Sequence, residues 1–453
     1  MSATMARTLA REVVTAVRVR DAYAHEVLSA ALEESKLSER DRGFATMLAY
    51  GTISCRGTLD EAVVRYLSPG RELEPMVGDA LAVSAYELLF SGKAAHAAVS
   101  EGVELVKAIR PAAAGLANAV LRKLAADAPT FPWGDPLTDI EALARLHGHP
   151  TWLAQLLVDE FGHEAAAAFM EADNEPAPLY LAHASLERSF EEVLDSLNRD
   201  GADPVETAID GCIEARVPSR AIASKALKRK DVLVCDAAAQ FAVSCVPSGP
   251  GAWIVEIGAG RGTKSVLLAA MARRRGGPAF RVTAVDPHAF KLKELRDTAS
   301  VLGLPEISTC VADATTDAPG LPADGSADAV LIDAPCTGLG TLRRHPDRRW
   351  KAKPEEIETL ALLGSALLQR AARLVKPGGF MVYSTCTVTR AENRGVLEEF
   401  LASEAGEGFA YDTVTANVPA GWERWLGEDG MFQSLPTQGG PDGHFVARLI
   451  RKG

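Results

Sequence analysis

The sequence predicts a multidomain chain in which an all-helical region and a small α+β module precede an α/β domain with a doubly wound, mostly parallel sheet. In the first region apolar residues recur at helical spacing, as at Leu9, Val13 and Val17, and no strand-like alternation emerges. Prolines from Pro129 to Pro136 then break the pattern. Further along, apolar runs of strand length alternate with amphipathic helices, which is typical of a parallel sheet. The three parts are expected at residues 1–130, 131–235 and 236–453.

The hydrophobic pattern also predicts the elements within each part. The helical region should hold five or six helices around one core. In the middle module we expect helices near 139–147, 151–161 and 187–199 and strands at 179–182 and 232–234. In the α/β domain we expect strands at 253–257, 282–285, 309–311, 329–332 and 380–383, and helices at 263–274, 288–302, 354–375 and 391–403. Ligands bind such sheets at the carboxyl ends of the strands, so the residues there are candidates for function.

Composition narrows the class of protein. The 453 residues are 47% apolar with a net charge of -12, and no segment has the unbroken apolar character of a membrane span or a signal peptide. The seven cysteines form no C-x-x-C pair, which disfavours disulfides and zinc and fits a reducing setting. We expect a cytoplasmic monomer that binds neither a membrane nor a metal.

Two clusters of basic residues suggest a nucleic acid partner despite the negative net charge, because phosphates respond to local charge. Either cluster alone could be an ordinary solvated surface. The first comprises Lys225, Lys228, Arg229 and Lys230. The second cluster is the stronger indication, because it contains an aromatic side chain and follows the segment Asp333-Ala-Pro-Cys336, which is discussed below. Its members are Arg343, Arg344, His345, Arg348, Arg349, Lys351 and Lys353, with Trp350 among them.

A glycine-rich loop follows the first strand of the α/β domain. Glycines let the backbone turn sharply and approach a ligand, and the start of the next helix offers free N–H groups. The dinucleotide pattern G-x-G-x-x-G is not met, because Thr263 stands where its last glycine would be. A tight turn without a ligand would also explain the loop. As a cofactor site it would contribute Gly258, Ala259, Gly260, Arg261, Gly262, Thr263 and Lys264.

Aspartates follow the next two strands. Asp286 ends the second strand, where an acidic residue can accept hydrogen bonds from ribose hydroxyls. Asp313 follows the third strand and could read an adenine edge. The ordered series of glycine loop, Asp286 and Asp313 suggests an adenosyl cofactor without saying which one.

Two cysteines end the fourth and fifth strands, in Asp333-Ala-Pro-Cys336 and Ser384-Thr-Cys386-Thr. A free cysteine is usually a small buried hydrophobe. That explanation suits Cys55, Cys212, Cys235, Cys245 and Cys310, but it fits poorly for cysteines on loops at the functional edge of a sheet.

Methylation of carbon 5 of a cytosine would use these groups. A thiolate that adds to carbon 6 makes carbon 5 nucleophilic, and a carboxylic acid can support the addition by protonating N3. After methyl transfer a base must remove the proton from carbon 5. Lys264 would lower the thiol pKa or contact the nucleobase.

The residues resemble the RsmB/Nop2/Sun family of RNA cytosine-5 methyltransferases. The run from Asp333 to Trp350 is similar to the first cysteine motif of the family, and Tyr383-Ser-Thr-Cys-Thr387 with Glu392-Asn393 is similar to the second. The N-terminal region resembles the NusB-type RNA-binding domain of the RsmB branch in Tyr50-Gly-Thr52, Leu59-Asp60, His96-Ala-Ala-Val99, Glu101 and Asn118-Ala-Val-Leu-Arg122, and His149-Pro-Thr-Trp152 resembles its connection to the catalytic half. The resemblance covers nearly the whole chain.

The resemblance implies a NusB-like all-α domain, a connecting α+β module and a Rossmann-like class I methyltransferase domain. It implies that Cys386 is the nucleophile, that Cys336 helps to release the product, and that Asp333 lies between the methionine portion of the cofactor and the target base. The cofactor implied is S-adenosylmethionine, bound by residues 258–264 with Asp286, Asp313 and Asp333. The substrate implied is a cytosine in small-subunit ribosomal RNA, so RNA is expected at the second basic cluster.

The sequence also departs from the family. The cofactor loop usually reads D-x-C-A-A-P-G-G-K-T, and here only Ala259, Gly262 and Lys264 match closely. An upstream segment that usually carries an arginine and an asparagine reads Tyr180-Leu-Ala-His183. Two alternatives stay open. One is an RNA-binding or ribosome-assembly factor that has lost the cofactor, which the intact cysteine motifs oppose. The other is an amino-methyltransferase, which would use Asp/Asn-Pro-Pro-aromatic where this chain has Asp333-Ala-Pro-Cys336.

Overall fold

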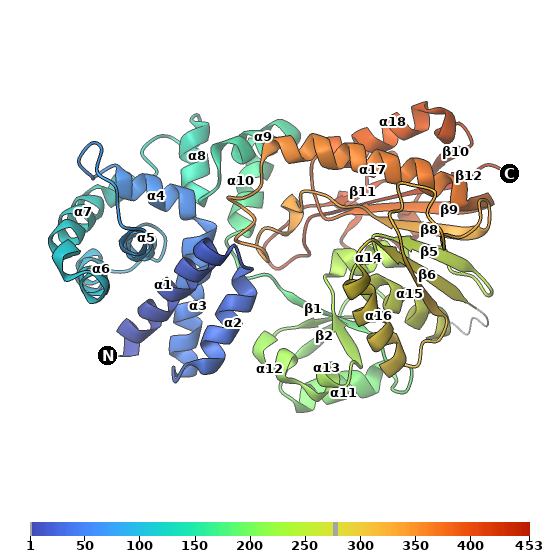
Figure 1. Cartoon of the computed structure of the whole chain (residues 1–453), viewed down its shortest axis with the longest axis horizontal. Helices are drawn as coiled ribbons and strands as arrows, with labels where there is room; N and C mark the ends of the chain where they lie inside the picture. Colours follow the sequence, from blue (N-terminus) through green and yellow to red (C-terminus); the bar gives the residue numbers. More distant parts are fainter. Residues whose placement is uncertain (1, 275–279) are drawn as a thin grey trace. The chain divides into compact units, whose positions relative to one another are not determined.

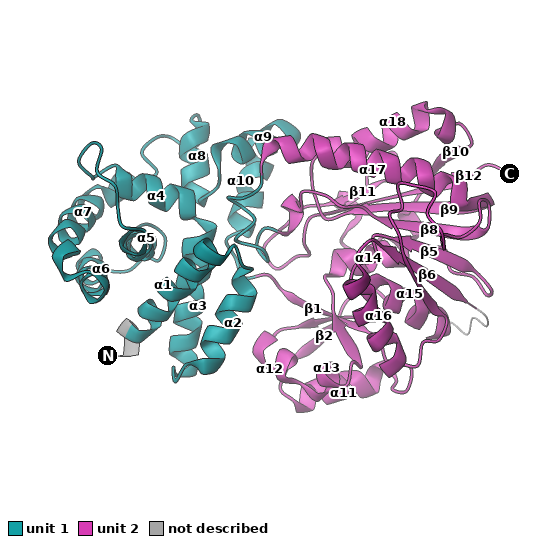
Figure 2. Cartoon of the chain, in the orientation of Figure 1, with its two compact units in different colours: residues 1–176, 342–352 teal, residues 177–341, 353–453 magenta. Residues whose placement is uncertain are grey.

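The computed structural model describes residues 2–274 and 280–453, which divide into two compact units (Figures 1 and 2). Unit 1 comprises residues 1–176 and 342–352, and unit 2 comprises residues 177–341 and 353–453. The boundaries expected at 130 and 235 therefore lie inside the two units. The short segment 342–352, expected within the α/β domain, belongs to unit 1 instead.

Unit 1 is helical, and its core forms where the apolar stripes of its helices meet. In α1 the spacing that predicted the helix buries Ala10, Val13, Val14 and Val17. The described residues of the N-terminal region form α1 (Ser2–Arg20), α2 (Ala24–Glu34), α3 (Glu39–Ser54), α4 (Arg56–Val64), α5 (Pro75–Leu89), α6 (Ala95–Ile109) and α7 (Ala114–Asp127), slightly more than the five or six helices expected.

Three further helices extend unit 1 beyond the expected boundary: α8 (Ile140–His147), α9 (Thr151–Phe161) and α10 (His163–Ala172), of which α10 was not expected. Asp139 caps α8, and Gly148 ends it with a positive φ of 65°. Arg145 on α8 forms an ion pair with Glu61 on α4 at 2.9 Å. A side chain at position 148 would lie 2.4 Å from the sulfur of Cys55. These contacts tie the segment after residue 130 to the helices before it.

The segment 342–352 is held in unit 1 by Arg349 and Trp350. Arg349 is fully buried, and the indole N–H of Trp350 donates a hydrogen bond to the carbonyl oxygen of Ser54 at 2.7 Å. A Cβ at Gly57 would lie 2.1 Å from the ring of Trp350, so this position needs a glycine. The Arg349 guanidinium donates to the carbonyl oxygens of Ser54, Gly148 and Asp173 and to the amide oxygen of Asn174, at 2.8–3.4 Å.

Unit 2 begins with a small antiparallel sheet in the order β2-β3-β1-β4. Its strands are β1 (Leu179–His183), β2 (Pro204–Glu206), β3 (Cys212–Ala215) and β4 (Val232–Val234), accompanied by α11 (Phe190–Arg199), α12 (Pro218–Ala223) and α13 (Lys225–Lys228). Ser189 and Glu192 form a capping box that starts α11. The structure confirms β1, β4 and α11 as expected, while β2, β3, α12 and α13 were missed because they are too short for a periodic pattern.

The large sheet has the strand order β10-β12-β9-β8-β5-β6-β7, with β11 paired to β12. Strands β5 (Trp253–Ile257), β6 (Arg281–Asp286), β7 (Ile307–Val311), β8 (Ala327–Asp333) and β9 (Val375–Thr385) run parallel and match the expected positions. Strands β10 (Phe409–Asp412), β11 (Phe432–Ser434) and β12 (His444–Arg451) are antiparallel additions that the sequence did not reveal.

Helices cover both faces of the large sheet (Figure 1). Ile254 packs into the core with α14 (Ala237–Ser244), α15 (Thr263–Arg274) and α16 (Ala289–Val301), while Val255 and Ile257 pack with α17 (Pro354–Leu374) and α18 (Val396–Ala402). A π-helical turn, Ala391–Gly395, precedes α18 within the helix expected at 391–403. Because β5 to β9 are parallel, their carboxyl ends lie at one edge.

In the described residues no helix combines the length and apolarity that a membrane crossing requires.

Candidate active site

The predicted site residues lie along the carboxyl edge of the large sheet in a defined order. Going from β7 to β9, they are Asp313 after β7, Asp286 at the end of β6, the glycine loop after β5, Asp333 and Cys336 after β8, and Cys386 after β9. The strand order differs from the chain order: it places the fourth predicted strand, β8, beside β5 and its glycine loop, and the fifth, β9, beside β8. This edge contains the aspartates expected to bind a cofactor at one side and the two cysteines at the other.

The glycines of the β5–α15 loop are required by close backbone approaches. Gly258 has φ of +79°, and a Cβ there would lie 2.3 Å from the carbonyl oxygen of Asp333. Gly262 has φ of +82°, and a Cβ there would lie 2.2 Å from Leu295. A side chain at either position would be strained and would collide with its neighbour. The divergent loop sequence thus still forms the tight strand-to-helix turn that a cofactor loop needs.

Asp286 holds the glycine loop in place. Its carboxylate accepts a hydrogen bond from the backbone N–H of Gly260 at 2.9 Å and another from the N–H of His288 at 2.8 Å. Asp286 is almost fully buried, whereas Asp313 is exposed. Hydrogen bonds from the N–H and hydroxyl of Thr315 lower the pKa of Asp313 and keep it ionised. The two aspartates, for which the sequence predicts contacts with the ribose and with the adenine, therefore differ in burial.

A second acidic residue, Glu256, lies buried under the loop and was not among the predicted site residues. Its Oε2 accepts a hydrogen bond from the hydroxyl of Ser265, and its Oε1 has no hydrogen-bond partner in the described residues. Burial raises the pKa of Glu256 to about 8. The carboxyl group is therefore largely protonated at neutral pH, which lowers the cost of burying it.

Lys264 and Asp333 form an ion pair in which Nζ and Oδ2 are 2.6 Å apart. Burial works to lower the pKa of Lys264, but the negative charge of Asp333 raises it above its ordinary value, so the ammonium group stays charged. The side chain of Asp333 is 31% exposed, so the pair opens to solvent on the acid's side. The pair contributes a fixed positive charge and an accessible carboxylate at the centre of the edge.

The two cysteine sulfurs lie next to each other, with Cys336 Sγ 3.5 Å from Cys386 Sγ. The hydrogen bond from Cys336 lowers the pKa of Cys386, and the charge of Lys264 lowers it further. The same hydrogen bond, together with burial, raises the pKa of Cys336 well above its ordinary value. Of the two sulfurs, Cys386 therefore loses its proton more readily, and Cys336 is the one that donates the hydrogen bond. Both are partly exposed, and Cys55, Cys212, Cys235, Cys245 and Cys310 are buried.

Sequence reasoning quoted Glu392 and Asn393 but gave them no role, and the structure brings both to the cysteines. The Glu392 carboxylate accepts hydrogen bonds from Thr337, the neighbour of Cys336, and from Thr387, the neighbour of Cys386. Asn393 bonds to Thr385 and Thr387 on either side of Cys386. The signal that could have found them was their place in the second cysteine motif.

The residues expected to bind RNA have different settings within unit 1. Arg349 is fully buried and its guanidinium bonds to backbone carbonyls, so its predicted contact with RNA is not supported. Arg343 is also buried, Arg344, Arg348 and Trp350 are half-buried, and His345 is exposed. Runs of arginine do not reveal which members face the interior. Only part of the cluster can therefore present charge to a polyanion.

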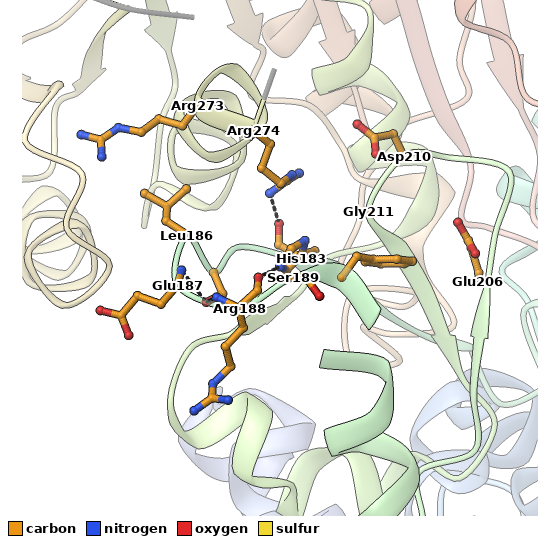
Figure 3. A pocket seen from close by; sticks show the side chains of 12 residues that line it. His183, Leu186, Glu187, Arg188, Ser189, Glu206, Asp210, Gly211, Arg273 and Arg274 are labelled. Atoms are coloured by element: carbon orange, nitrogen blue, oxygen red, sulfur yellow. Dashed lines mark hydrogen bonds between the residues drawn. The ribbon is translucent and has the colours of Figure 1, made fainter. Parts of the chain in front are cut away.

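A cavity of unit 2 lies elsewhere, beside the small sheet and the end of α15 (Figure 3). It has a volume of about 480 Å³, and both basic and acidic side chains line it, including Arg188, Arg274 and Asp210. Figure 3 shows the Arg274 guanidinium directed at the carbonyl oxygen of His183, at 2.9 Å. None of the predicted catalytic or cofactor-binding residues lines this cavity.

Comparisons with known proteins agree with the class of protein that this fold and site define, a Rossmann-like methyltransferase with a helical N-terminal domain. Residues 246–450 match the family described as 16S rRNA methyltransferase RsmB/F, and residues 4–126 match the NusB family. The chain is 33% identical to the ribosomal RNA small subunit methyltransferase B of Thermus thermophilus, over 95% of this chain and 94% of that protein. The chain belongs to the RsmB/F family of ribosomal RNA methyltransferases.

Other comparisons extend over the full length of the chain. It is 32% identical to a probable ribosomal RNA small subunit methyltransferase B of Synechocystis, over 98% of this chain and 99% of that protein. The solved structure of the protein PH0851 superposes with a TM-score of 0.77 at 24% identity, covering 98% of each chain. The structural likeness shows that the whole fold, including the helical domain, is shared.

Proposed function

We propose that this RNA methyltransferase transfers a methyl group from S-adenosylmethionine to carbon 5 of a cytosine in small-subunit ribosomal RNA, through a covalent bond between Cys386 and carbon 6 of the base. The observation that carries the proposal is the Cys336–Cys386 pair, 3.5 Å apart, beside the Lys264–Asp333 ion pair. Transfer to an exocyclic amine needs no thiolate, and the Asp333-Ala-Pro-Cys336 segment lacks the aromatic residue that would hold an amine. Work on ribosomal RNA would take place in the cytoplasm.

The nucleophile follows from the charges around the two sulfurs. A thiolate, and not a thiol, adds to an electron-poor ring, and the Lys264 charge together with the Cys336 hydrogen bond stabilises the thiolate of Cys386. In the addition, the Cys386 sulfur forms a bond to carbon 6 and the electron pair moves toward N3. N3 would take up a proton from solvent as the bond forms, and the partly exposed Asp333 carboxylate is placed to accept a hydrogen bond from it.

Cys336 is suited to the elimination step, in which the carbon 5 proton is removed and the Cys386 sulfur leaves the base. It keeps its proton while Cys386 is a thiolate, and it lies within 3.5 Å of the bond that must break. Once Cys386 is bonded to carbon 6, Cys336 no longer donates a hydrogen bond to a thiolate, so the largest of the causes that raise its pKa is removed. Cys336 can then lose its proton to solvent, and its sulfur can act as a base. Removal of the carbon 5 proton then lets the Cys386 sulfur leave and restores the aromatic ring.

The cofactor proposed is supported by the edge of the sheet between β5 and β7. The glycine loop leaves no room for a Cβ at Gly258 or Gly262, and Asp286 and Asp313 follow neighbouring strands. Residues 258–264 with Asp286, Asp313 and Asp333 would hold S-adenosylmethionine, which supplies an electrophilic methyl group when bound. In this arrangement Asp333 would lie between the cofactor and the base, with Lys264 fixing its orientation.

The test is a methylation assay on small-subunit ribosomal RNA transcribed without modifications. We expect the parent protein with S-adenosylmethionine to produce 5-methylcytosine at a defined position in bisulfite sequencing, and Cys386→Ala to produce none. A methyl group found on an exocyclic amine would contradict the chemistry. Failure to bind S-adenosylmethionine in calorimetry at millimolar concentration would favour an RNA-binding assembly factor instead.

A further inference from the structure

One buried carboxylate is bonded to both cysteine loops. Oε1 of Glu392 accepts a hydrogen bond from the backbone N–H of Thr337 at 2.6 Å, and Oε2 accepts one from the hydroxyl of the same residue at 2.7 Å. Oε2 also lies 3.2 Å from the hydroxyl of Thr387. Thr337 follows Cys336 and Thr387 follows Cys386, so a single side chain spans the two loops.

Both carboxylate oxygens of Glu392 must accept hydrogen bonds, because donors surround each of them. The hydroxyl of Thr389 donates to Oε2 at 2.8 Å, and the hydroxyls of Thr337 and Thr387 are 2.8 Å apart. Each hydroxyl has one proton to donate, so Thr337 and Thr389 donate to the carboxylate, while Thr387 shares its proton between the Thr337 hydroxyl and Oε2 of Glu392. An amide of the same shape would direct N–H groups at one or more of these donors.

Asn393 completes the arrangement from the next position in the chain. Its Oδ1 accepts a hydrogen bond from the hydroxyl of Thr385 at 2.6 Å, and its Nδ2 donates to the carbonyl oxygen of Thr387 at 3.2 Å. The π-helical turn at Ala391–Gly395 contains Glu392 and Asn393, and both are buried. Such turns are rare and occur often at functional sites. The π-helical turn therefore places the side chains of Glu392 and Asn393 against the two cysteine loops.

The charge of Glu392 also affects the pKa of Cys336. Burial raises the pKa of Glu392, and the hydrogen bonds from its threonine neighbours oppose that rise. The negative charge of Glu392 is one of the causes that raise the pKa of Cys336, after its hydrogen bond to Cys386 and its burial. A charge near Cys336 thus favours the arrangement in which Cys336 keeps its proton and Cys386 is the thiolate.

We propose that Glu392 is a positioning residue that clamps the Cys336 loop to the Cys386 loop and so fixes the distance between the two sulfurs. Glu392 is buried and bonds to the neighbours of the cysteines, so it acts through them and not on the substrate. The consequence for methyl transfer rests on the proposed function, whereas the clamp itself is a property of the folded chain.

The clamp can be tested without RNA by titrating the full chain with phenylarsine oxide. This arsenical bonds to two adjacent thiols at once and releases its oxygen as water, so it reports how close the sulfurs are held. The parent should bind one arsenical across Cys336 and Cys386, located by mass spectrometry. Glu392→Gln should weaken binding on the order of tenfold, because the loops move apart. Glu399→Gln, an exposed carboxylate on α18, is the matched control and should bind as the parent does.

A second pair of variants covers the case in which Glu392→Gln does not fold. Thr337→Val removes one donor to Glu392 and should weaken arsenical binding in the same direction, while Thr337→Ser keeps the hydroxyl and should restore it. Unchanged arsenical affinity in Thr337→Val and in any folded Glu392→Gln would overturn the proposal.

Kinetics then connect the clamp to the reaction. In a methylation assay Glu392→Gln or Thr337→Val should lower kcat, by about 10²-fold for a displacement near 1 Å, and leave KM for RNA unchanged. Unchanged kcat would contradict a positioning role. If the parent itself does not methylate RNA, the proposed function fails, while the arsenical titration still decides whether Glu392 holds the two cysteines together.

Discussion

Residues 333–341 and 342–352 are continuous in sequence, but they belong to different compact units. The first stretch places Asp333 and Cys336 at the sheet edge beside Lys264. The second packs among the helices of unit 1 through Arg349 and Trp350. A motif that is continuous in sequence thus has one half at the candidate site and one half packed among the helices of unit 1. The difference teaches that continuity in sequence does not give every residue of a motif the same role.

Two cations, the half-buried Lys264 and the buried Arg349, show the same contrast at the level of single side chains. Lys264 pairs with a carboxylate that is partly open to solvent, so its charge can act on a ligand. Arg349 donates its hydrogen bonds to backbone carbonyls and an amide in an interior without exposure. The chemistry of the partner, and not the cation itself, separates the two roles.

The largest expected effect on stability comes from Arg349→Met. Its backbone and amide acceptors would lose a charged donor inside the protein, which should cost roughly 3–5 kcal/mol. Urea denaturation followed by circular dichroism measures it. The control is Lys351→Met in the same segment, whose exposed ion pair with Asp21 should be worth less than about 1 kcal/mol. Equal losses for the two variants would mean that Arg349 does not anchor the segment.

Lys264→Met should slow methyl transfer by about 10²-fold at neutral pH, the size expected for losing one charged group at a reacting centre. The Lys264 charge helps to lower the pKa of Cys386, so its removal raises that pKa and reduces the thiolate fraction. The rate at which iodoacetamide alkylates Cys386 should therefore begin to rise at a higher pH than in the parent. Lys264→Arg should keep the parent profile. Superimposed profiles for parent and Lys264→Met would exclude this role.

Asp286→Ala should weaken binding of S-adenosylmethionine by roughly 1.5–3 kcal/mol, measured by calorimetry. The loss has two sources, because Asp286 also orders the loop through Gly260. Asp313→Ala removes an exposed carboxylate and should cost less than about 1 kcal/mol. A larger loss for Asp313 than for Asp286 would reverse the order of importance along the edge.

The smallest effect is expected on the surface of the second basic cluster. Arg344→Gln should weaken RNA binding by about 1 kcal/mol and reduce the dependence of affinity on salt by about one phosphate contact. Fluorescence anisotropy at several salt concentrations measures both. An unchanged salt dependence would place RNA elsewhere. Deleting residues 1–130 is a less clean test, because it removes Ser54, which accepts hydrogen bonds from Arg349 and Trp350.

Much of the fold follows from local pattern. The strands Trp253–Ile257 and Ala327–Asp333 stand out because both faces of a parallel sheet are covered, which makes such strands continuous apolar runs. Strands β10 to β12 were missed because they follow the last expected helix without that pattern. They are defined by pairing, since β12 pairs with β9, and β10 and β11 pair with β12. The place of segment 342–352 also depends on contacts distant in sequence, which no local window contains.

The candidate site could also be predicted only as far as local sequence pattern determines it. The types and strand-end positions of Cys336, Cys386 and Asp333 could be predicted, because parallel strands bring their carboxyl ends to one edge. The 3.5 Å between the sulfurs and the role of Glu392 could not, because they arise from side chains on a π-helical turn and two loops. The burial of Arg349 was equally hidden, since an arginine in a basic run carries no sign of which way it faces.

The most direct test of the account is a denaturing gel of each cysteine variant incubated with S-adenosylmethionine and small-subunit ribosomal RNA. Cys336→Ala should still add to the base and accept the methyl group, but elimination should stall, leaving methylated RNA attached to the protein. Cys386→Ala and the double variant should show no adduct. An adduct in Cys386→Ala alone would reverse the two roles, and free turnover by both single variants would mean that the cysteines are structural.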